Sequence, residues 1–141
     1  MPGTAQAKVR VRASVLAAMR EQARLRLPEE CCGLLAGVAE VVTELIPASN
    51  ALASSRAYFI DPIELIGAFR AMRERGLRHL GIYHSHPTGP NFPSPRDVEM
   101  AYYPACAYFI VSPVAAFDLQ IRAFTIRNGR VEELEVEPAA G

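Results

Sequence analysis

One helix-start signal occurs twice in this sequence, on either side of an apolar strand. Each copy has a short polar residue, then proline, then an acid at the third helical position: Asp61–Glu64 reads Asp-Pro-Ile-Glu and Ser94–Asp97 reads Ser-Pro-Arg-Asp. The first residue can cap the helix, proline fits the first turn, and the acid favours the positive end of the helix dipole. The apolar run His79–His84 between them predicts a strand. The middle of the chain is therefore predicted as helix, strand, turn and helix.

Strand and helix patterns alternate along the rest of the chain. Ser14 is predicted to cap the first helix, and the helix after Asp61 is predicted to bury an apolar face that includes Ile66 and to end at Gly76. The third helix is predicted to run to about Tyr103. The predicted strands are 8–12, 30–37, 41–46, 58–60, 79–84, 107–111, 119–127 and 130–136, the last two joined by an Asn-Gly turn. This order indicates an α+β fold, a single domain over residues 1–141 in which a mixed β-sheet is flanked by helices.

The charge balance and the cysteine content narrow the class of protein. The chain has 15 basic and 15 acidic residues and three cysteines. A balanced charge implies no general attraction to nucleic acid or to an anionic membrane. An odd number of cysteines does not indicate a disulfide framework, the N-terminus has no apolar signal-peptide core, and no apolar segment is long enough to span a membrane. We therefore expect a cytoplasmic protein with reduced thiols.

Two histidines lie at the end of the central predicted strand. His84 and His86 are two residues apart, so strand alternation places both imidazoles on one face of the sheet. Asp97 follows eleven residues later, in the first turn of the next helix. Two histidines and one aspartate can bind zinc and leave the fourth tetrahedral position open for water, which is the arrangement of a catalytic metal. The pattern predicts one catalytic zinc ion.

Hydrolysis would also need a proton acceptor that is not a metal ligand. Glu29 and Glu30 are the candidates, because they open an apolar strand after a proline and one of them can face the metal. Strand alternation places Glu30 on the same face as Cys32 and Glu29 on the other. Ser94 has two possible roles: its hydroxyl could stabilise an oxyanion, or it could be used as the helix cap.

Other reactive residues have simpler interpretations. Cys31, Cys32 and Cys106 could supply a thiol nucleophile or zinc ligands, but they lie in apolar segments, where free cysteine usually packs as a small hydrophobic residue. A zinc deaminase would require a Pro-Cys-x-x-Cys motif, which this sequence lacks. His79 fits neither pattern and is predicted to be a strand-start or surface residue.

The spacing of the candidate residues resembles a known family. His84 and His86, seven further residues, Ser94, two residues and Asp97 match without a gap the signature of the JAMM (MPN+) metallopeptidases. The segment 28–35, Pro-Glu-Glu-Cys-Cys-Gly-Leu-Leu, is similar to the family pattern Pro-x-Glu-x-Cys-Gly-Leu-Leu. Asn50 and Asp61–Glu64 also resemble the small stand-alone bacterial members, so the resemblance extends over most of the chain.

The resemblance implies a role for each residue. It selects Glu30 over Glu29 as general base and acid, gives zinc to His84, His86 and Asp97, and makes Ser94 the oxyanion stabiliser. It also implies an MPN-type α+β fold with a layering like that of cytidine deaminases.

The resemblance further implies a substrate class. Family members hydrolyse amide or isopeptide bonds at the C-terminal tail of ubiquitin-like proteins, and compact bacterial members act on sulfur-carrier proteins of ubiquitin-like fold. Such a tail could lie along 50–59 as an added strand. The alternative is a catalytically silent interaction module of the same fold, which should lack one of the four residues Glu30, His84, His86 and Asp97; all four are present.

Overall fold

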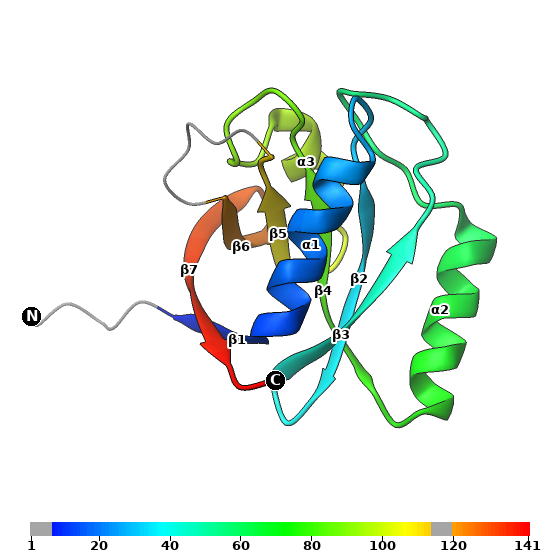
Figure 1. The fold of residues 1–141 in the computed structure, drawn as a ribbon, viewed down its shortest axis with the longest axis vertical. Helices are drawn as coiled ribbons and strands as arrows, with labels where there is room; N and C mark the ends of the chain where they lie inside the picture. Colours follow the sequence, from blue (N-terminus) through cyan, green and yellow to red (C-terminus); the bar gives the residue numbers. More distant parts are fainter. Residues whose placement is uncertain (1–6, 114–119) are drawn as a thin grey trace, which may run out of the picture.

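The computed structural model describes residues 7–113 and 120–141, and Figure 1 shows the arrangement of their helices and strands. In chain order the elements are β1 (Lys8–Arg12), α1 (Ala13–Leu25), β2 (Cys32–Val38), β3 (Val41–Ala48), α2 (Pro62–Glu74), β4 (Arg78–Ser85), α3 (Pro95–Glu99), β5 (Ala107–Val111), β6 (Ile121–Arg127) and β7 (Arg130–Ala139). None of the helices among these residues has the length and apolar character needed to cross a bilayer.

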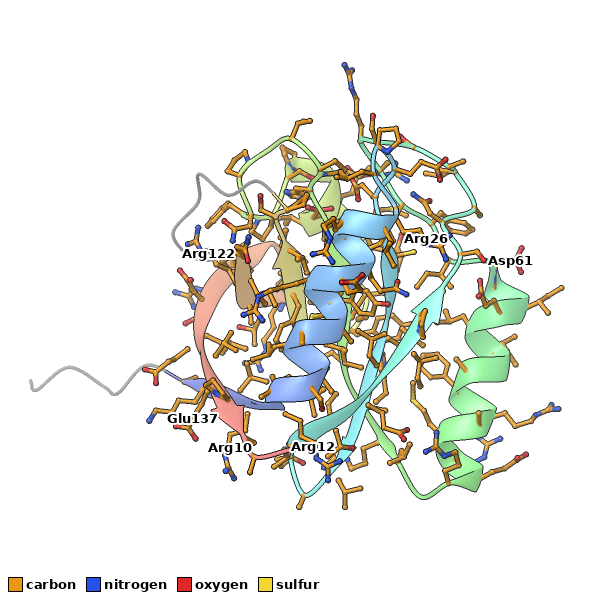
Figure 2. All side chains as sticks on the ribbon, in the orientation of Figure 1. Arg10, Arg12, Arg26, Asp61, Arg122 and Glu137 are labelled. Carbon is orange, nitrogen blue, oxygen red and sulfur yellow. The ribbon has the colours of Figure 1, made fainter. Side chains whose placement is uncertain are left out.

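All of these strands belong to one mixed sheet that closes into a barrel in the order β1-β3-β2-β4-β5-β6-β7. β1 pairs in parallel with both β3 and β7, and β4 pairs in parallel with β5, while the other pairs are antiparallel. At the closing pair Arg10 forms an ion pair with Glu137 at 3.1 Å (Figure 2). Exposed ion pairs contribute little, so the backbone pairing of β1 with β7 closes the barrel. The predicted α+β fold with a mixed sheet is confirmed. The closure of this sheet into a barrel was not predicted from the sequence.

The two long helices cover opposite faces of the sheet, because side chains of a strand alternate between faces. Leu35, Tyr83 and Phe109 pack with the buried face of α1, whereas Leu34 and Ile82 pack in a second core with α2. Each fully buried side chain of this size contributes about 1.5–3 kcal/mol. The two cores therefore hold β2, β4 and β5 at the centre, and the end of β4 is rigidly placed.

Several predicted boundaries are wrong. Ser14 is not a helix cap: it lies inside α1, whose cap residue is Arg12, and the Ser14 N–H donates to the Gly141 carbonyl oxygen at 2.9 Å. β1 runs directly into α1, which leaves no turn for a cap. The segment 58–60 is not a strand of the sheet, because the backbone of Phe59 is bonded to the loop before it. α3 ends at Glu99 rather than near Tyr103.

The signals at the start of α2 are confirmed, but its buried face is narrower than predicted. The Asp61 carboxylate accepts the Ile63 N–H at 2.8 Å, and Gly76 follows the helix with a φ of 69°; Figure 2 shows Asp61 at the start of the helix. Ile66, however, is 61% exposed, because only one side of α2 contacts the sheet. At the C-terminal hairpin β6 begins at Ile121, and the predicted start at Leu119 lies outside the described residues.

Candidate metal centre

Three side chains predicted as metal ligands converge at the end of β4. His84 is the second-last residue of β4, and His86 follows the strand but continues its pairing, since its N–H donates to the Val111 carbonyl oxygen at 2.9 Å. The Nε2 atoms of the two histidines are 3.1 Å apart, and Asp97 Oδ2 lies 3.2 Å from His84 Nε2 and 3.0 Å from His86 Nε2. Strand alternation and the first turn of α3 thus bring three donor atoms to one point.

This donor set fits a divalent metal. His86 Nδ1 lies 2.7 Å from the Pro90 carbonyl oxygen, which can only accept, so Nδ1 carries the ring proton and the Nε2 lone pair faces Asp97. A cation bound among these three atoms would stabilise such a close contact of electron-rich groups. Tetrahedral zinc ligands at about 2.0–2.1 Å from the metal stand about 3.3–3.4 Å from one another, close to the separations found here. Within the described part of the chain, no other group of three or more His, Cys, Asp or Glu side chains is arranged in this way.

The protonation states of His84 and Asp97 suit metal ligands. Burial lowers the pKa of His84, which is 1% exposed, and therefore favours the neutral imidazole. Burial raises the pKa of Asp97, but its interactions with His84, His86 and the Ser94 N–H outweigh burial and hold the pKa well below its usual range. Asp97 is therefore ionised at any working pH and supplies the negative charge of the site.

Glu30 is the carboxylate that the fold brings to this site. It is 4% exposed, while Glu29 points into solvent. Burial raises the pKa of Glu30 to about 7. The charge of His86 lowers this pKa and the charge of Asp97 raises it, so the Glu30 carboxyl interacts electrostatically with both candidate ligands. Glu30 Oε1 is buried and has no hydrogen-bond partner among the described residues. An uncompensated buried carboxyl oxygen beside a metal site is available for proton transfer.

The backbone of Glu30 is tied to the strand that carries the histidines. Cys31 N–H donates to Ser85 Oγ at 2.8 Å, and Ser85 N–H donates to the Cys31 carbonyl oxygen at 3.1 Å. Asn50 Nδ2 donates to the Glu30 carbonyl oxygen at 3.3 Å, and Glu30 N–H donates to the Ser54 carbonyl oxygen at 2.8 Å. A role for Ser85 was not predicted from the sequence. Its position could have indicated this role: Ser85 lies between His84 and His86, so strand alternation directs its side chain to the opposite face of the sheet.

Tyr58 is a second residue of the site that was not predicted from the sequence. Its ring stacks on the His84 ring with centroids 4.6 Å apart and an interplanar angle of 23°. Burial raises the pKa of Tyr58 well above its ordinary value, so the hydroxyl stays protonated. The segment 58–60, although not a strand, therefore covers one side of the metal site.

Ser94 is the cap of α3. Its Oγ accepts the Asp97 N–H at 3.1 Å, and its own N–H donates to Asp97 Oδ2 at 2.9 Å, so the two residues form a complete capping box. The box also orients Asp97 toward the histidines. The cap uses the Ser94 oxygen as acceptor and leaves the hydroxyl proton for another partner.

Two cavities flank the metal site. One, of about 210 Å³, is lined by Glu30, His86, Ser94 and residues of the two adjoining loops. The other, of about 110 Å³, is apolar and is here called the aromatic groove. Its lining residues are Leu34, Tyr58, Phe59, Ile60, Leu65, Ile82, Met100, Tyr102, Tyr103 and Tyr108. Since Tyr58 lines the groove and stacks on His84, the groove lies next to the candidate ligands.

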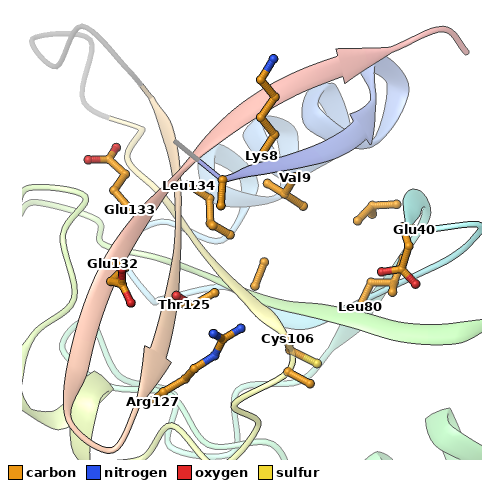
Figure 3. A pocket seen from close by; sticks show the side chains of 14 residues that line it. Lys8, Val9, Glu40, Leu80, Cys106, Thr125, Arg127, Glu132, Glu133 and Leu134 are labelled. Atoms are coloured by element: carbon orange, nitrogen blue, oxygen red, sulfur yellow. The ribbon is translucent and has the colours of Figure 1, made fainter. Parts of the chain in front are cut away.

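A larger cavity lies elsewhere. It measures about 570 Å³, and Figure 3 shows its walls, which include Val9, Leu80 and Leu134. Leu80 and Ala107 lie near the start of β4 and β5, whereas His84 lies near the end of β4. This cavity is therefore at the opposite end of the strands, and none of the three candidate ligands lines it.

The chain is similar to known proteins over most of its length. The family model described as prokaryotic homologs of the JAB domain matches residues 12–127. A desampylase of Haloferax volcanii is 42% identical over 105 residues, which is 72% of this chain and 76% of the relative. A probable TtuB-protein conjugate cleaving protease of Thermus thermophilus is 40% identical over 111 residues, 77% and 70% of the two chains. A CysO-cysteine peptidase of Mycobacterium tuberculosis is 34% identical over 125 residues, 87% and 86% of the two chains.

Solved structures share the fold. A protein of Desulfitobacterium hafniense matches with a TM-score of 0.83 and 30% identity, over 94% of this chain and 93% of that chain. A JAB1/MPN domain protein of Archaeoglobus fulgidus matches with a TM-score of 0.61 and 24% identity, over 91% and 98% of the two chains. The predicted resemblance to JAMM/MPN proteins is confirmed.

Proposed function

The chain belongs to the family of prokaryotic homologs of the JAB domain, and we propose that it is a zinc-dependent peptidase that hydrolyses an amide bond at or near the C-terminal tail of a ubiquitin-like or sulfur-carrier protein. The observation that carries this proposal is the convergence of His84, His86 and Asp97 beside the buried carboxyl of Glu30. The relatives support the substrate class, since two of them are named for TtuB-protein conjugates and for CysO-cysteine. A silent interaction module would not need all four residues in one place.

We propose that His84, His86 and Asp97 hold the zinc ion. When bound, zinc supplies Lewis-acid chemistry that polarises the scissile carbonyl and lowers the pKa of water. The hydrogen bond from His86 Nδ1 to Pro90 fixes the ring orientation, as outer partners of metal ligands commonly do. The capping box with Ser94 fixes the carboxylate of Asp97.

Glu30 is proposed to move the proton. Its pKa of about 7 allows it to accept a proton from the attacking water and to return it to the leaving amine near neutral pH. A cation bound to the three ligands would lower this pKa and favour the ionised, basic form. Its burial keeps solvent water from competing for the proton.

The aromatic groove is the proposed path of the substrate tail. Phe59 N–H donates to Asn50 Oδ1 and its carbonyl oxygen accepts the Ala51 N–H, so the loop engages this residue from one side. In an extended segment the neighbouring residues direct their backbone groups to the other side. Tyr58 and Ile60 could therefore pair with a tail laid into the groove as an added strand. The apolar walls would then select the side chains of the tail.

The function can be tested with an amide fusion to a ubiquitin-like tail. The purified protein is expected to contain about one zinc per chain by metal analysis, and a chelator is expected to abolish cleavage, because the bound zinc would supply the Lewis acid of the reaction. Adding zinc back should restore the rate. Full activity in a preparation free of metal would contradict the proposal.

Ser94 variants separate its two roles. Ser94→Ala is expected to lower the free energy of unfolding by about 1 kcal/mol, since the cap of α3 is lost, whereas glycine at a cap costs only a few tenths. Ser94→Gly should therefore stay nearly as stable as the parent while lacking the hydroxyl. If the hydroxyl stabilises the oxyanion, Ser94→Gly should still lose about 10²-fold in kcat. Urea unfolding and steady-state kinetics measure the two effects, and a kcat unchanged in Ser94→Gly would leave Ser94 with the capping role alone.

The raised pKa of Glu30 predicts a pH-dependent cost to stability in metal-free protein. Below its ordinary pKa of 4.5 the carboxyl is neutral in both folded and unfolded chains. As the pH rises to about 7 the unfolded chain loses the proton first, so stability falls. Above that pH the cost is about 3 kcal/mol, since a tenfold change in proton affinity corresponds to about 1.4 kcal/mol.

Glu30→Gln removes this titration. With chelator present, the variant is expected to be more stable than the parent by up to about 3 kcal/mol at pH 9 and about equally stable at pH 4. Urea unfolding at both pH values provides the comparison. Equal stability at pH 9 would mean that the buried carboxylate is compensated by a group not identified in this site.

A further inference from the structure

The loop 87–93 connects the end of β4 to the start of α3 and contacts the candidate ligands at both of its ends. Its Pro90 carbonyl oxygen lies 2.7 Å from His86 Nδ1. The loop leads into Ser94, whose capping box orients Asp97. Prolines at positions 87, 90 and 93 remove three backbone N–H donors from the loop. Side-chain contacts are therefore needed to fix its position.

Phe92 packs this loop onto the sheet. Its ring meets the ring of Phe124 on β6 edge to face, with centroids 5.3 Å apart and an interplanar angle of 76°. Phe124 is fully buried and belongs to the core on the α2 side of the sheet. Edge-to-face contact is a favoured arrangement of two aromatic rings. The loop thus rests on a rigid part of the barrel, although Phe92 itself is half-exposed.

The Arg122 guanidinium contacts both rings. Its Cζ lies 5.6 Å from the centroid of the Phe92 ring and 5.3 Å from that of Phe124, within the range of a cation–π contact. Glu133 on β7 accepts two bonds from this guanidinium, from Nε at 2.9 Å and from Nη2 at 2.7 Å. Two parallel bonds fix the plane of the guanidinium as well as its place. We call Phe92, Phe124, Arg122 and Glu133 the loop clamp, and Figure 2 shows its Arg122 on β6.

The register of the sheet places the loop clamp on the same face as a candidate ligand. His84 pairs with Ile110 of β5, and Ile110 pairs with Arg122 of β6. Paired residues of neighbouring strands point to one face, so His84 and Arg122 lie in one row, two strands or about 10 Å apart. The loop therefore reaches from the end of β4 across this face to β6, where the clamp holds it.

We propose that the loop clamp positions the Pro90 carbonyl oxygen and thereby orients His86 for the metal; this inference rests on the proposed function. Phe92 lies two residues from Pro90 and two residues from Ser94, so a shift of its ring moves the outer partners of both His86 and Asp97. Outer partners set the tautomer and the orientation of a ligating histidine. The clamp residues are positioning residues, because they act through the loop.

The experiment uses two variants that open the clamp and two that do not. Phe92→Ala removes the loop ring, and Arg122→Gln keeps both rings but removes the cation and its double bond to Glu133. Phe92→Tyr is the conservative variant, because it keeps an aromatic ring at a half-exposed position. Arg10→Gln is the matched control, because Arg10 lies on β1 and also pairs with an acid of β7, Glu137, at 3.1 Å.

Zinc affinity is measured by competition with a chromophoric chelator. Phe92→Ala and Arg122→Gln are expected to weaken zinc binding by about 10–100-fold, the range for a lost outer partner, while Phe92→Tyr and Arg10→Gln stay within about twofold of the parent. Urea unfolding of each metal-free variant checks that it is folded. If Phe92→Ala does not fold, Arg122→Gln decides the result.

The His86 tautomer provides a second measurement that needs neither metal nor substrate. In metal-free parent protein at alkaline pH, ¹⁵N NMR should find the ring proton on Nδ1, where Pro90 accepts it. In Phe92→Ala and Arg122→Gln this acceptor is loosened, so the proton should move in part to Nε2, where Asp97 Oδ2 lies 3.0 Å away. A purely structural role of the clamp would lower stability and leave the tautomer of folded protein unchanged.

Three outcomes would overturn the inference. Both opened variants could keep the zinc affinity and the tautomer of the parent, Arg10→Gln could weaken zinc binding as much as Arg122→Gln, or Phe92→Ala could change only KM, which would make Phe92 a substrate contact. Failure of the proposed function is a different result: the parent would bind zinc and cleave no ubiquitin-like tail. If the parent binds no zinc, the proposed function also fails, and the tautomer comparison still decides whether the clamp orients His86.

Discussion

Glu30→Gln is expected to lower kcat for amide hydrolysis by about 10²–10⁴-fold while zinc still binds at about one ion per chain, the range that a positioned general acid and base contributes. Glutamine keeps nearly the same shape, so the backbone bonds of Glu30 to Asn50 and Ser54 remain available. It cannot accept a proton from water or return one to the leaving amine. The loss should therefore appear in turnover and not in metal content.

Glu29→Gln is the matched control for this experiment. The two glutamates are adjacent in sequence, but Glu29 is exposed and Glu30 is buried at the metal site. Steady-state kinetics and metal analysis on both variants should show a full rate for Glu29→Gln. A full rate for Glu30→Gln as well would assign the base to a different group.

His86→Ala is expected to lose both zinc and activity. The replacement removes a proposed zinc ligand, and it leaves Asp97 Oδ2 beside one imidazole instead of two. Loss of an outer partner of a metal ligand already costs 10–100-fold in affinity or activity, in rough terms, so loss of a ligand itself should exceed about 100-fold. Metal analysis after dialysis should find much less than one zinc per chain.

His79 provides the control, because it is the third histidine of the chain and is not near the ligands. Its ring packs against Phe69 and Tyr103, and Cys106 Sγ lies 3.6 Å from its Nδ1. His79→Ala should therefore reduce stability through lost packing while folded protein keeps its zinc and its rate. Loss of zinc in His79→Ala but not in His86→Ala would contradict the ligand assignment.

The three cysteines were predicted to pack as small hydrophobic residues and not to act as reactive thiols. Cys31, Cys32 and Cys106 are free and buried, and burial raises the pKa of Cys32 to about 12 and of Cys106 to about 11. A thiol with so high a pKa is not a nucleophile at neutral pH. The prediction that they pack as small hydrophobic residues is confirmed.

The amino-acid sequence by itself determined the local parts of the site. Residue alternation along β4 placed His84 and His86 on one face, and the capping signal at Ser94 placed Asp97 in the first turn of α3. These signals are reliable because each depends on backbone geometry and hydrogen bonds within about four residues. The bounds of β1 and β5 were predictable for the same reason.

Only the tertiary structure decided which distant residues meet. The register that pairs Cys32 with His84 brings Glu30 to the ligands, and the bonds of Ser85 to Cys31 hold it there. The stacking of Tyr58 on His84, the closure of the barrel and the exposure of Ile66 also depend on contacts between segments far apart in the chain. No local pattern encodes such contacts, because sheet register and helix packing are set by the summed burial of the whole core.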